Sequence, residues 1–328
     1  LSEDFLKISK KHKLDELTSR VLYQRGIHDE SEIEKFLKPN LEDLHDPFLL
    51  HDMEKATQRI LSAIEQGENI LIYGDYDADG MTAASVMKSA LDELGAEAQV
   101  YLPNRFTDGY GPNLDVYQYY INNENINLII TVDNGVAGVE AIAWAQENGV
   151  DVIITDHHSM PDQMPNAYAI IHPEHPESQY PFKYLAGVGV AFKVACALLE
   201  YAPREMLDLV AIGTIADMVS LTDENRILVA HGLKVLAQTE RAGLQELMKY
   251  AGVDFDKVTE ETVGFQIAPR LNALGRLDDP NPAIELLTGW DEDEAHEIAK
   301  MIDQKNSERK DIVEKIHNEA LAMLTDEP

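Results

Sequence analysis

The chain of 328 residues has a single cysteine, Cys196, and no run of apolar residues near the roughly 20 needed to cross a bilayer. One thiol has no partner for an internal disulfide, which fits a reducing compartment, and the apolar stretch around Cys196 predicts a small buried side chain. No signal segment opens the sequence. A phosphate loop of the form GxxxxGK[ST] is also missing, which disfavours an ATP-driven motor. Together these features predict a cytoplasmic protein without a membrane span.

Basic side chains are scarce, because 27 Lys and Arg residues stand against 59 Asp and Glu residues, and the formal net charge is −32. A surface this acidic repels polyanions, so composition alone argues against the binding of nucleic acid. Divalent cations can reverse that argument locally, since carboxylates gathered around such ions are neutralised. The hydrophobic fraction of 45% is sufficient for a large core and excludes a mainly disordered chain.

Short apolar runs alternate with helix-like segments in the first half of the chain. The runs lie at residues 70–73, 98–102, 128–132 and 152–155. This alternation predicts an α/β fold with a parallel sheet that carries helices on both faces. Beyond residue 187 the pattern becomes mainly helical and ends in one long charged helix.

We expect four segments along the chain. They are an N-terminal helical segment (1–56), the α/β domain that would carry the chemistry (57–222), a helical extension (223–290) and a long connecting helix (291–328). Within the extension, residues 264–277 are expected to be less regular than their neighbours.

Acidic and imidazole side chains follow three of the four predicted strands. They are Asp75, Asp77 and Asp79 after the first strand, Asp133 after the third, and Asp156, His157 and His158 after the fourth. In open parallel sheets, ligands bind at the carboxyl ends of the strands, near the point where the strand order reverses. These side chains are therefore expected to meet at one edge of the sheet.

Carboxylates gathered at the ends of buried strands repel one another and are forced to protonate unless a cation neutralises them. Mixed carboxylate and imidazole ligands suit Mn²⁺ or Mg²⁺ better than a structural zinc ion. Two such ions, roughly 3.5–4 Å apart, would activate water for in-line attack at phosphorus, which is phosphoester hydrolysis. In the alternative interpretation, each aspartate caps its loop or the helix that follows it.

Four segments, in order, resemble the motifs of the DHH phosphoesterases: residues 74–80 (GDYDADG), 132–135 (VDNG), 156–158 (DHH) and 213–219 (GTIADMV). Within that superfamily, three further segments resemble the bacterial RecJ family of single-strand-specific exonucleases: residues 103–111 (PNRFTDGYG), 185–193 (LAGVGVAFK) and 269–276 (PRLNALGR). The resemblance covers the chain from about residue 50 to the end. Four motifs in the family's order are more specific than the DHH tripeptide alone.

The resemblance implies two divalent cations, with Mn²⁺ preferred and Mg²⁺ as the alternative. The implied metal ligands are Asp75, Asp77, Asp79, Asp133, His157 and Asp217. Among them Asp133 would bridge both ions, and Asp75, Asp133 and His158 are the candidate catalytic residues. His158 would contact the scissile phosphate or protonate the leaving group, while Asp156 would orient a histidine or cap its loop.

Candidate phosphate-binding residues come from the two arginine-containing motifs. They are Arg105 and Arg276, together with His158, and the weaker candidates are Asn272 and Arg270. Ion pairs with surface acids are the alternative for these arginines. Backbone N–H groups at residues 187–189 could contact a phosphate, although close helix packing would equally explain the two glycines there.

Other polar and aromatic motifs have simpler interpretations. His172 and His175 are expected to be loop residues rather than a second metal pair. Tyr117, Tyr119 and Tyr120 are expected to serve packing rather than base stacking.

The resemblance implies a 5′-to-3′ exonuclease that acts on single-stranded DNA in repair and recombination, with a single-strand-binding protein and a helicase as possible partners. Two alternatives stay open: a DHH enzyme that acts on short oligonucleotides or nucleotide bisphosphates, and a non-catalytic scaffold in a replication complex. RecJ-like chains continue into a DHH-associated domain and an oligonucleotide-binding fold, and neither is expected within these 328 residues.

Overall fold

The computed structural model describes residues 1–325. Its centre is a five-stranded sheet, in the order β2-β1-β3-β4-β5, in which every neighbouring pair is parallel. The strands are β1 (Ile70–Tyr73), β2 (Ala98–Tyr101), β3 (Leu128–Val132), β4 (Asp151–Thr155) and β5 (Ala169–Ile171). The α/β prediction is confirmed. The three-residue β5 is an addition that the apolar pattern did not indicate.

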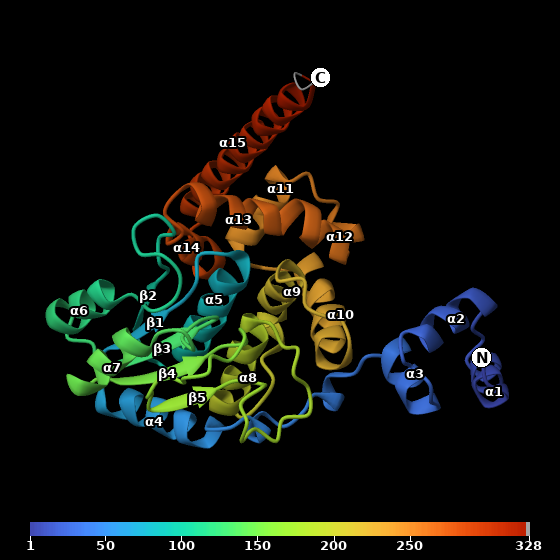
Figure 1. The fold of residues 1–328 in the computed structure, drawn as a ribbon, viewed down its shortest axis with the longest axis horizontal. Helices are drawn as coiled ribbons and strands as arrows, with labels where there is room; N and C mark the ends of the chain where they lie inside the picture. Colours follow the sequence, from blue (N-terminus) through green and yellow to red (C-terminus); the bar gives the residue numbers. More distant parts are fainter. Residues whose placement is uncertain (326–328) are drawn as a thin grey trace.

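Helices cover both faces of the sheet because alternate strand side chains point in opposite directions. On one face, Ile72 and Ile130 belong to the main core with α4, α5 and α8, whereas on the other Leu71 and Ile129 belong to a second core with α6 and α7 (Figure 1). The helices of this part are α4 (Met53–Gln66), α5 (Ala78–Glu93), α6 (Leu114–Asn123), α7 (Val139–Glu147), α8 (Gly187–Leu199), α9 (Leu207–Ala216) and α10 (Asp223–Ala237). Cys196, on α8, packs against the main core as a partly buried side chain.

The strand order reverses at β1, which lies between β2 and β3. The chain enters β2 on one side of β1 and β3 on the other, so that the loops after β1 and β3 emerge side by side at the carboxyl edge. Such a switch point is the usual ligand site of an open α/β sheet. The fold therefore brings the two acidic loops together at that edge.

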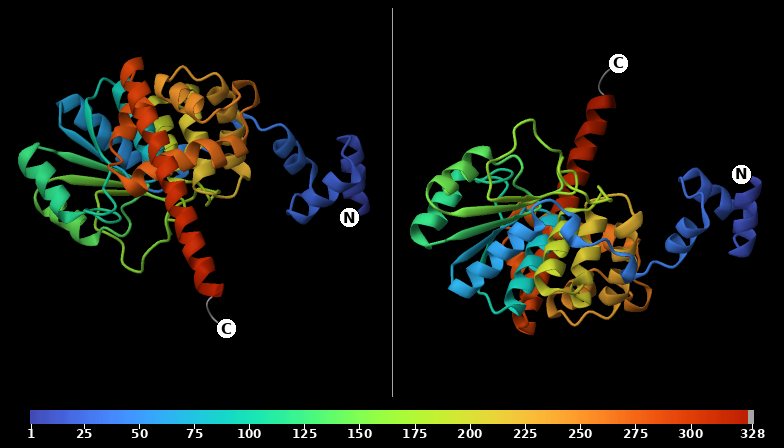
Figure 2. Two further views of the ribbon diagram at one scale, coloured as in Figure 1. Left: turned by 90° about the horizontal axis from the view of Figure 1, so that it is seen from above. Right: turned by 90° about the horizontal axis from the view of Figure 1, so that it is seen from below.

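The C-terminal part is helical throughout: α11 (Ala242–Tyr250), α12 (Glu260–Thr262), the π-helical turn η5 (Val263–Ile267), α13 (Ala268–Leu277), α14 (Pro282–Thr288) and α15 (Glu292–Thr325). The expectation of less regular structure is confirmed for the π-helical turn, but it is wrong for residues 268–277, which form the regular helix α13. Pro269 lies in the first turn of α13, where proline lacks only an N–H that would have no helical partner. Helix α15 projects from the body (Figure 2). Residues 326–328 of the predicted connecting helix lie outside the described residues.

Three N-terminal helices, α1 (Glu3–Lys11), α2 (Glu16–Gln24) and α3 (Glu30–Leu37), form a small module that stands apart from the body (Figure 2). The module has its own core of Phe5, Leu22 and Ile33. Arg226 of α10 joins it to the body, because its Nε donates to the Phe36 carbonyl oxygen at 2.6 Å. The remaining 3₁₀ turns are η1 (Leu41–Asp43), η2 (Pro47–Leu49), η3 (Arg204–Met206) and η4 (Phe255–Lys257). No helix among residues 1–325 has both the length and the apolar character needed to span a membrane.

Candidate metal centre

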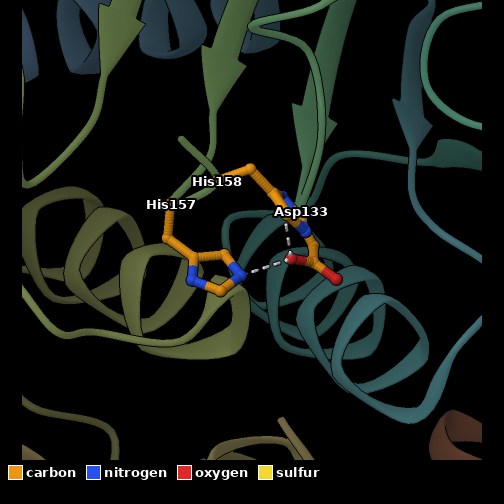
Figure 3. A group of neighbouring side chains, drawn as sticks. All are labelled: Asp133, His157 and His158. Atoms are coloured by element: carbon orange, nitrogen blue, oxygen red, sulfur yellow. Dashed lines mark ion pairs between the residues drawn. The ribbon is translucent and has the colours of Figure 1, made fainter. Parts of the chain in front are cut away.

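Acidic and imidazole side chains from four loops meet at the carboxyl edge of the sheet. Asp133 follows β3 and lies beside His157, which follows β4, as Figure 3 shows. The three aspartates after β1 and Asp217, which follows α9, complete the cluster. The predicted meeting of these side chains is thus observed.

The contact between Asp133 and His157 lies at the centre of the cluster. Nε2 of His157 lies 3.0 Å from Oδ1 of Asp133. Nevertheless, Nε2 and both carboxylate oxygens of Asp133 are buried without a hydrogen bond to any of residues 1–325. Buried polar atoms are nearly always satisfied, so exceptions call for an unseen partner. A cation among these atoms would satisfy all three, and the donor set therefore fits a metal ion.

A set made of Asp133, His157 and His158 links two separate sets of three side chains, and within each set the candidate ligand atoms lie within 4.8 Å of one another. One set is Asp79, His157 and Asp217, and the other is Asp75, Asp77 and Asp133. His157 connects the sets, because its Nε2 lies 3.6 Å from Asp79 Oδ2 and 3.0 Å from Asp133 Oδ1. Two adjacent ligand sets, joined through His157 and Asp133, are the arrangement that a pair of ions requires.

Burial and mutual repulsion perturb the carboxylates strongly. Burial, followed by the charge of Asp77, raises the pKa of Asp75 to about 7 and that of Asp217 to about 6. Burial, reinforced by neighbouring carboxylates, raises the pKa of both Asp79 and Asp133 well above the ordinary value. Without cations this cluster would therefore hold protons near neutral pH, whereas bound cations would displace them.

The two histidines are in opposite states. Burial, followed by the charge of His158, lowers the pKa of His157 to about 4, which leaves a neutral ring able to coordinate a metal. Burial, the largest single influence, disfavours the charged form of His158 as well, but the hydrogen bond to Asp156 and the charges of nearby carboxylates together outweigh it and raise the pKa above 6.5. Nδ1 of His158 lies 2.7 Å from Oδ1 of Asp156. The expectation that Asp156 orients a histidine is confirmed.

Asp156 also caps its loop. Its Oδ1 accepts the N–H groups of His157 at 2.7 Å and His158 at 3.1 Å, and its Oδ2 accepts the N–H of Val136 at 3.1 Å. His172 supports the same loop, because its Nε2 lies 2.8 Å from the carbonyl oxygen of His158. His172 is thus a buried support of the loop.

Two aspartates also act as helix caps, as the alternative interpretation proposed. Oδ1 of Asp77 accepts the N–H of Gly80 at the start of α5. The carboxylate of Asp79 accepts the N–H groups of Gly187 at 2.7 Å and Val188 at 2.8 Å, at the start of α8. These two N–H groups therefore bind a carboxylate of the protein, which disfavours the alternative in which they contact a phosphate. Each carboxylate oxygen has a second lone pair, so a cap can also coordinate a metal.

Asn134 is a positioning residue to which the sequence pattern assigned no role. Its Nδ2 donates to the carbonyl oxygens of Gly74 at 2.8 Å and Val132 at 2.9 Å, which ties the loops after β1 and β3 together. Asp133 beside it has a φ of +59°, an unusual backbone conformation for a residue other than glycine. In the sequence, the one indication of this role was the asparagine side chain that follows Asp133 in the VDNG motif.

The two arginine motifs flank the cluster. Arg105 is exposed and its guanidinium carbon lies 5.9 Å from the ring centre of Tyr76, which stands between Asp75 and Asp77. Arg276 is exposed as well, and a Cβ atom on Gly275 beside it would lie 1.8 Å from the carbonyl oxygen of Tyr76. Neither arginine forms an ion pair with the other described residues.

The weaker phosphate candidates have partners within the protein. Oδ1 of Asn272 accepts the N–H of Ala78 at 2.9 Å, which fastens α13 to the first turn of α5. Arg270 pairs with Asp303 at 2.9 Å, as the alternative interpretation proposed. Tyr117 is buried in the second core, while Tyr119 is exposed and donates to Glu124.

Comparison with known proteins gives the chain its family. The DHH family, N-terminal domain, matches residues 69–214. The single-stranded-DNA-specific exonuclease RecJ of Bacillus subtilis (strain 168) is 50% identical over 308 residues, which are 94% of this chain and 39% of that protein. The RecJ of Escherichia coli (strain K12) is 37% identical over 95% of this chain and 56% of its own length. The chain therefore spans between 39% and 56% of these two relatives.

Solved structures agree. The crystal structure of exonuclease RecJ bound to manganese is 33% identical, with a TM-score of 0.78 over 87% of this chain and 72% of that one. RecJ from Thermus thermophilus in complex with Mn²⁺ is 30% identical, with a TM-score of 0.80 over 93% of this chain and 44% of that one. The chain belongs to the DHH family and, within it, to the RecJ group.

Proposed function

We propose that this chain hydrolyses phosphodiester bonds with the help of two divalent cations and acts as an exonuclease on single-stranded DNA. The observation that carries the proposal is the set of buried, unpartnered ligand atoms on Asp133 and His157. RecJ relatives are single-stranded-DNA-specific exonucleases by name, and solved RecJ structures contain Mn²⁺ or Mg²⁺. Both facts support the proposal, since this chain spans only part of those relatives.

One ion would be held by Asp79, His157 and Asp217, the other by Asp75 and Asp77, with Asp133 between the two. When bound, the ions supply positive charge that lowers the pKa of the attacking water and stabilises the charge that develops at phosphorus. Neutral His157 offers Nε2 as a ligand, because its pKa of about 4 keeps the ring unprotonated at neutral pH.

His158 would act on the substrate rather than on the metals. Asp156 holds its Nδ1, so that Nε2 is the ring nitrogen left to face a phosphate. The raised pKa favours the protonated ring, and that proton would pass to the leaving oxygen. Tyr110 packs edge-on against this ring, with 5.6 Å between centroids, and limits its rotation.

Arg105, Arg276 and the free Nδ2 of Asn272 would bind phosphates of the strand at the mouth of the site. Guanidinium groups match phosphate oxygens in a bidentate geometry. Their positive charges near Tyr76 would offset the acidity of the chain where the substrate enters. The 5′-to-3′ direction follows the RecJ resemblance.

The finer assignments are part of the same proposal. Residues 57–222 would be the catalytic unit, with residues 223–290 as its helical extension and the helix from residue 291 as a connection. A role in repair and recombination, with a single-strand-binding protein and a helicase as partners, would follow from the substrate. A DNA substrate also agrees with the cytoplasmic location that the sequence predicts.

The proposal is tested by the release of mononucleotides from 5′-labelled single-stranded DNA with Mn²⁺, beside duplex DNA and a nucleotide bisphosphate. Asp133→Asn should abolish release, and Asp162→Asn, in an exposed loop, should leave it unchanged. Turnover of the bisphosphate with DNA untouched would overturn the proposal in favour of a small-substrate enzyme. Mn²⁺ binding without turnover of any substrate would overturn it in favour of a scaffold.

A further inference from the structure

A cavity of about 400 Å³ lies at the far end of two helices whose near ends carry metal-site residues. Helix α5 begins beside Asp77 and ends at Glu93, on the cavity wall. Helix α9 packs against α5 and runs the opposite way, from Met206 at the cavity to Asp217 at the metal site. The 16 residues of α5 span about 24 Å, so the cavity is remote from the proposed chemistry.

The floor of the cavity is fixed by a closed polar network. Asp208 accepts hydrogen bonds from Thr239 Oγ1 at 2.8 Å and from Arg241 Nε at 3.1 Å. Arg241 also donates from Nη1 to the carbonyl oxygen of Leu287 at 3.0 Å. The single arginine of the cavity is thus neutralised and turned inward. A phosphate or another anion would find no free cation there.

The rim carries uncompensated negative charge. Glu205 and Glu240 are exposed and form no side-chain ion pair or hydrogen bond among residues 1–325. Glu93 accepts a hydrogen bond from the Tyr201 hydroxyl, an arrangement that leaves its charge in place. These carboxylates repel nucleic acid and attract cationic side chains.

Trp290 gives the same rim a large apolar surface. Trp290 belongs to the short link that joins α14 to α15 and is 78% exposed, while Met206 and Val235 contribute apolar surface to the cavity wall. An exposed tryptophan beside free carboxylates suits lysine and arginine, whose stems pack on the ring while their charged ends reach the acids. Tryptophan is also over-represented among the residues that dominate protein interfaces.

We propose that this cavity docks a lysine- and arginine-rich segment of a partner protein, with an aliphatic side chain and cationic stems on Trp290 and the charged ends on Glu205 and Glu240. The proposal stands on the cavity alone and is independent of the function proposed above. Because the cavity and the metal site occupy opposite ends of α5 and α9, a docked segment would leave the metal site open.

The test measures binding of the fluorescein-labelled peptide KRKLKRK to the whole chain by fluorescence anisotropy at physiological salt. The Glu205→Gln/Glu240→Gln variant should bind at least tenfold more weakly, and Trp290→Ala should lose a similar factor. The matched control is Glu65→Gln/Glu147→Gln, which removes the same charge at exposed sites outside the cavity and should stay within twofold of the parent. Mn²⁺ binding should be equal in all four proteins, which verifies their folding.

Three results would overturn the proposal. Equal weakening in the control variant would mean that the peptide follows the net charge of the whole surface. Binding of a fluorescein-labelled oligothymidylate to the parent chain, lost in Trp290→Ala, would mean that the face binds nucleic acid. Dimers in sedimentation that disappear in Trp290→Ala would mean that a second copy of the chain covers this face.

Discussion

A Cβ atom on Gly187 would lie 2.3 Å from Oδ1 of Asp133. Helix α8 therefore approaches the centre of the carboxylate cluster as closely as a backbone can. The backbone N–H of Gly187 also donates to the Asp79 carboxylate at 2.7 Å. Gly187 therefore fixes the positions of two candidate ligands, Asp79 and Asp133. The glycine at this position is required by the close approach.

Gly187→Ala should consequently weaken metal binding although it removes no ligand. The methyl group must displace the Asp133 carboxylate or shift α8, at a cost of about 1–3 kcal/mol. We expect Mn²⁺ affinity, measured by calorimetry, to fall by roughly ten- to hundredfold, in line with that cost. In the control Gly264→Ala, the added Cβ would meet only Ile215, at 3.8 Å, and the affinity should not change. Unchanged affinity in Gly187→Ala would show that Asp133 is not held where α8 touches it.

Asp156→Asn should destabilise the fold by about 2–3 kcal/mol, because it replaces a buried charge that accepts four hydrogen bonds. The asparagine side chain would keep one acceptor oxygen, but its NH₂ group would face N–H groups that need an acceptor. Urea unfolding of the metal-free protein measures the loss, with Asp162→Asn as the exposed counterpart. Equal midpoints for the two variants would contradict the role of Asp156 as the support of the histidine loop.

Arg105→Ala and Arg276→Ala should each raise KM for single-stranded DNA by roughly tenfold or more, since a charged hydrogen bond to phosphate contributes about 1.5–3 kcal/mol. Mn²⁺ binding should stay at the parent level because neither arginine lies among the ligand sets. Arg25→Ala, an exposed arginine of the N-terminal module, is the control for loss of positive charge. An equal rise in KM for all three variants would mean that these arginines act through net charge only.

The stability of the metal-free protein should fall as pH rises from about 6.5 to 8. Burial raises the folded-state pKa of Asp75 to about 7, and the pKa values of Asp79, Asp133 and His158 are raised as well, so the folded state holds protons that the unfolded state has released. Stability decreases with pH wherever the folded state binds more protons. Burial lowers the pKa of His157 to about 4 and lowers the pKa values of His172 and His175 as well, and these three groups act in the opposite sense to the four raised ones.

The melting temperature in EDTA, followed across this pH range, measures the effect. Mn²⁺ needs deprotonated carboxylates, so the gain in melting temperature on adding Mn²⁺ should grow over the same interval. A melting temperature in EDTA that is flat or rises with pH would contradict the assigned protonation of the cluster.

The sequence predicted the sheet and its acidic edge because both follow from local pattern. Short apolar runs define β1 and β3, and parallel strands must deliver the residues that follow them to one edge. Asp75 and Asp133 could therefore be placed near each other without any knowledge of distant contacts.

Contacts between segments that are far apart in the chain could not be predicted from the local sequence pattern. The carboxylate of Asp79 accepts the N–H of Gly187, and Asn272 accepts the N–H of Ala78, pairings that depend on how α8 and α13 pack. Residues 268–277 were expected to be less regular but form a helix, because tertiary packing supports it despite Pro269.

The central claim is that two divalent cations bind on either side of Asp133. Anomalous diffraction at the manganese edge, from crystals of the chain soaked in Mn²⁺, tests it most directly. The account predicts two peaks that share the Asp133 carboxylate, one toward His157 and Asp217 and the other toward Asp75 and Asp77. Absence of both peaks from this edge of the sheet, in crystals that take up Mn²⁺ elsewhere, would contradict it.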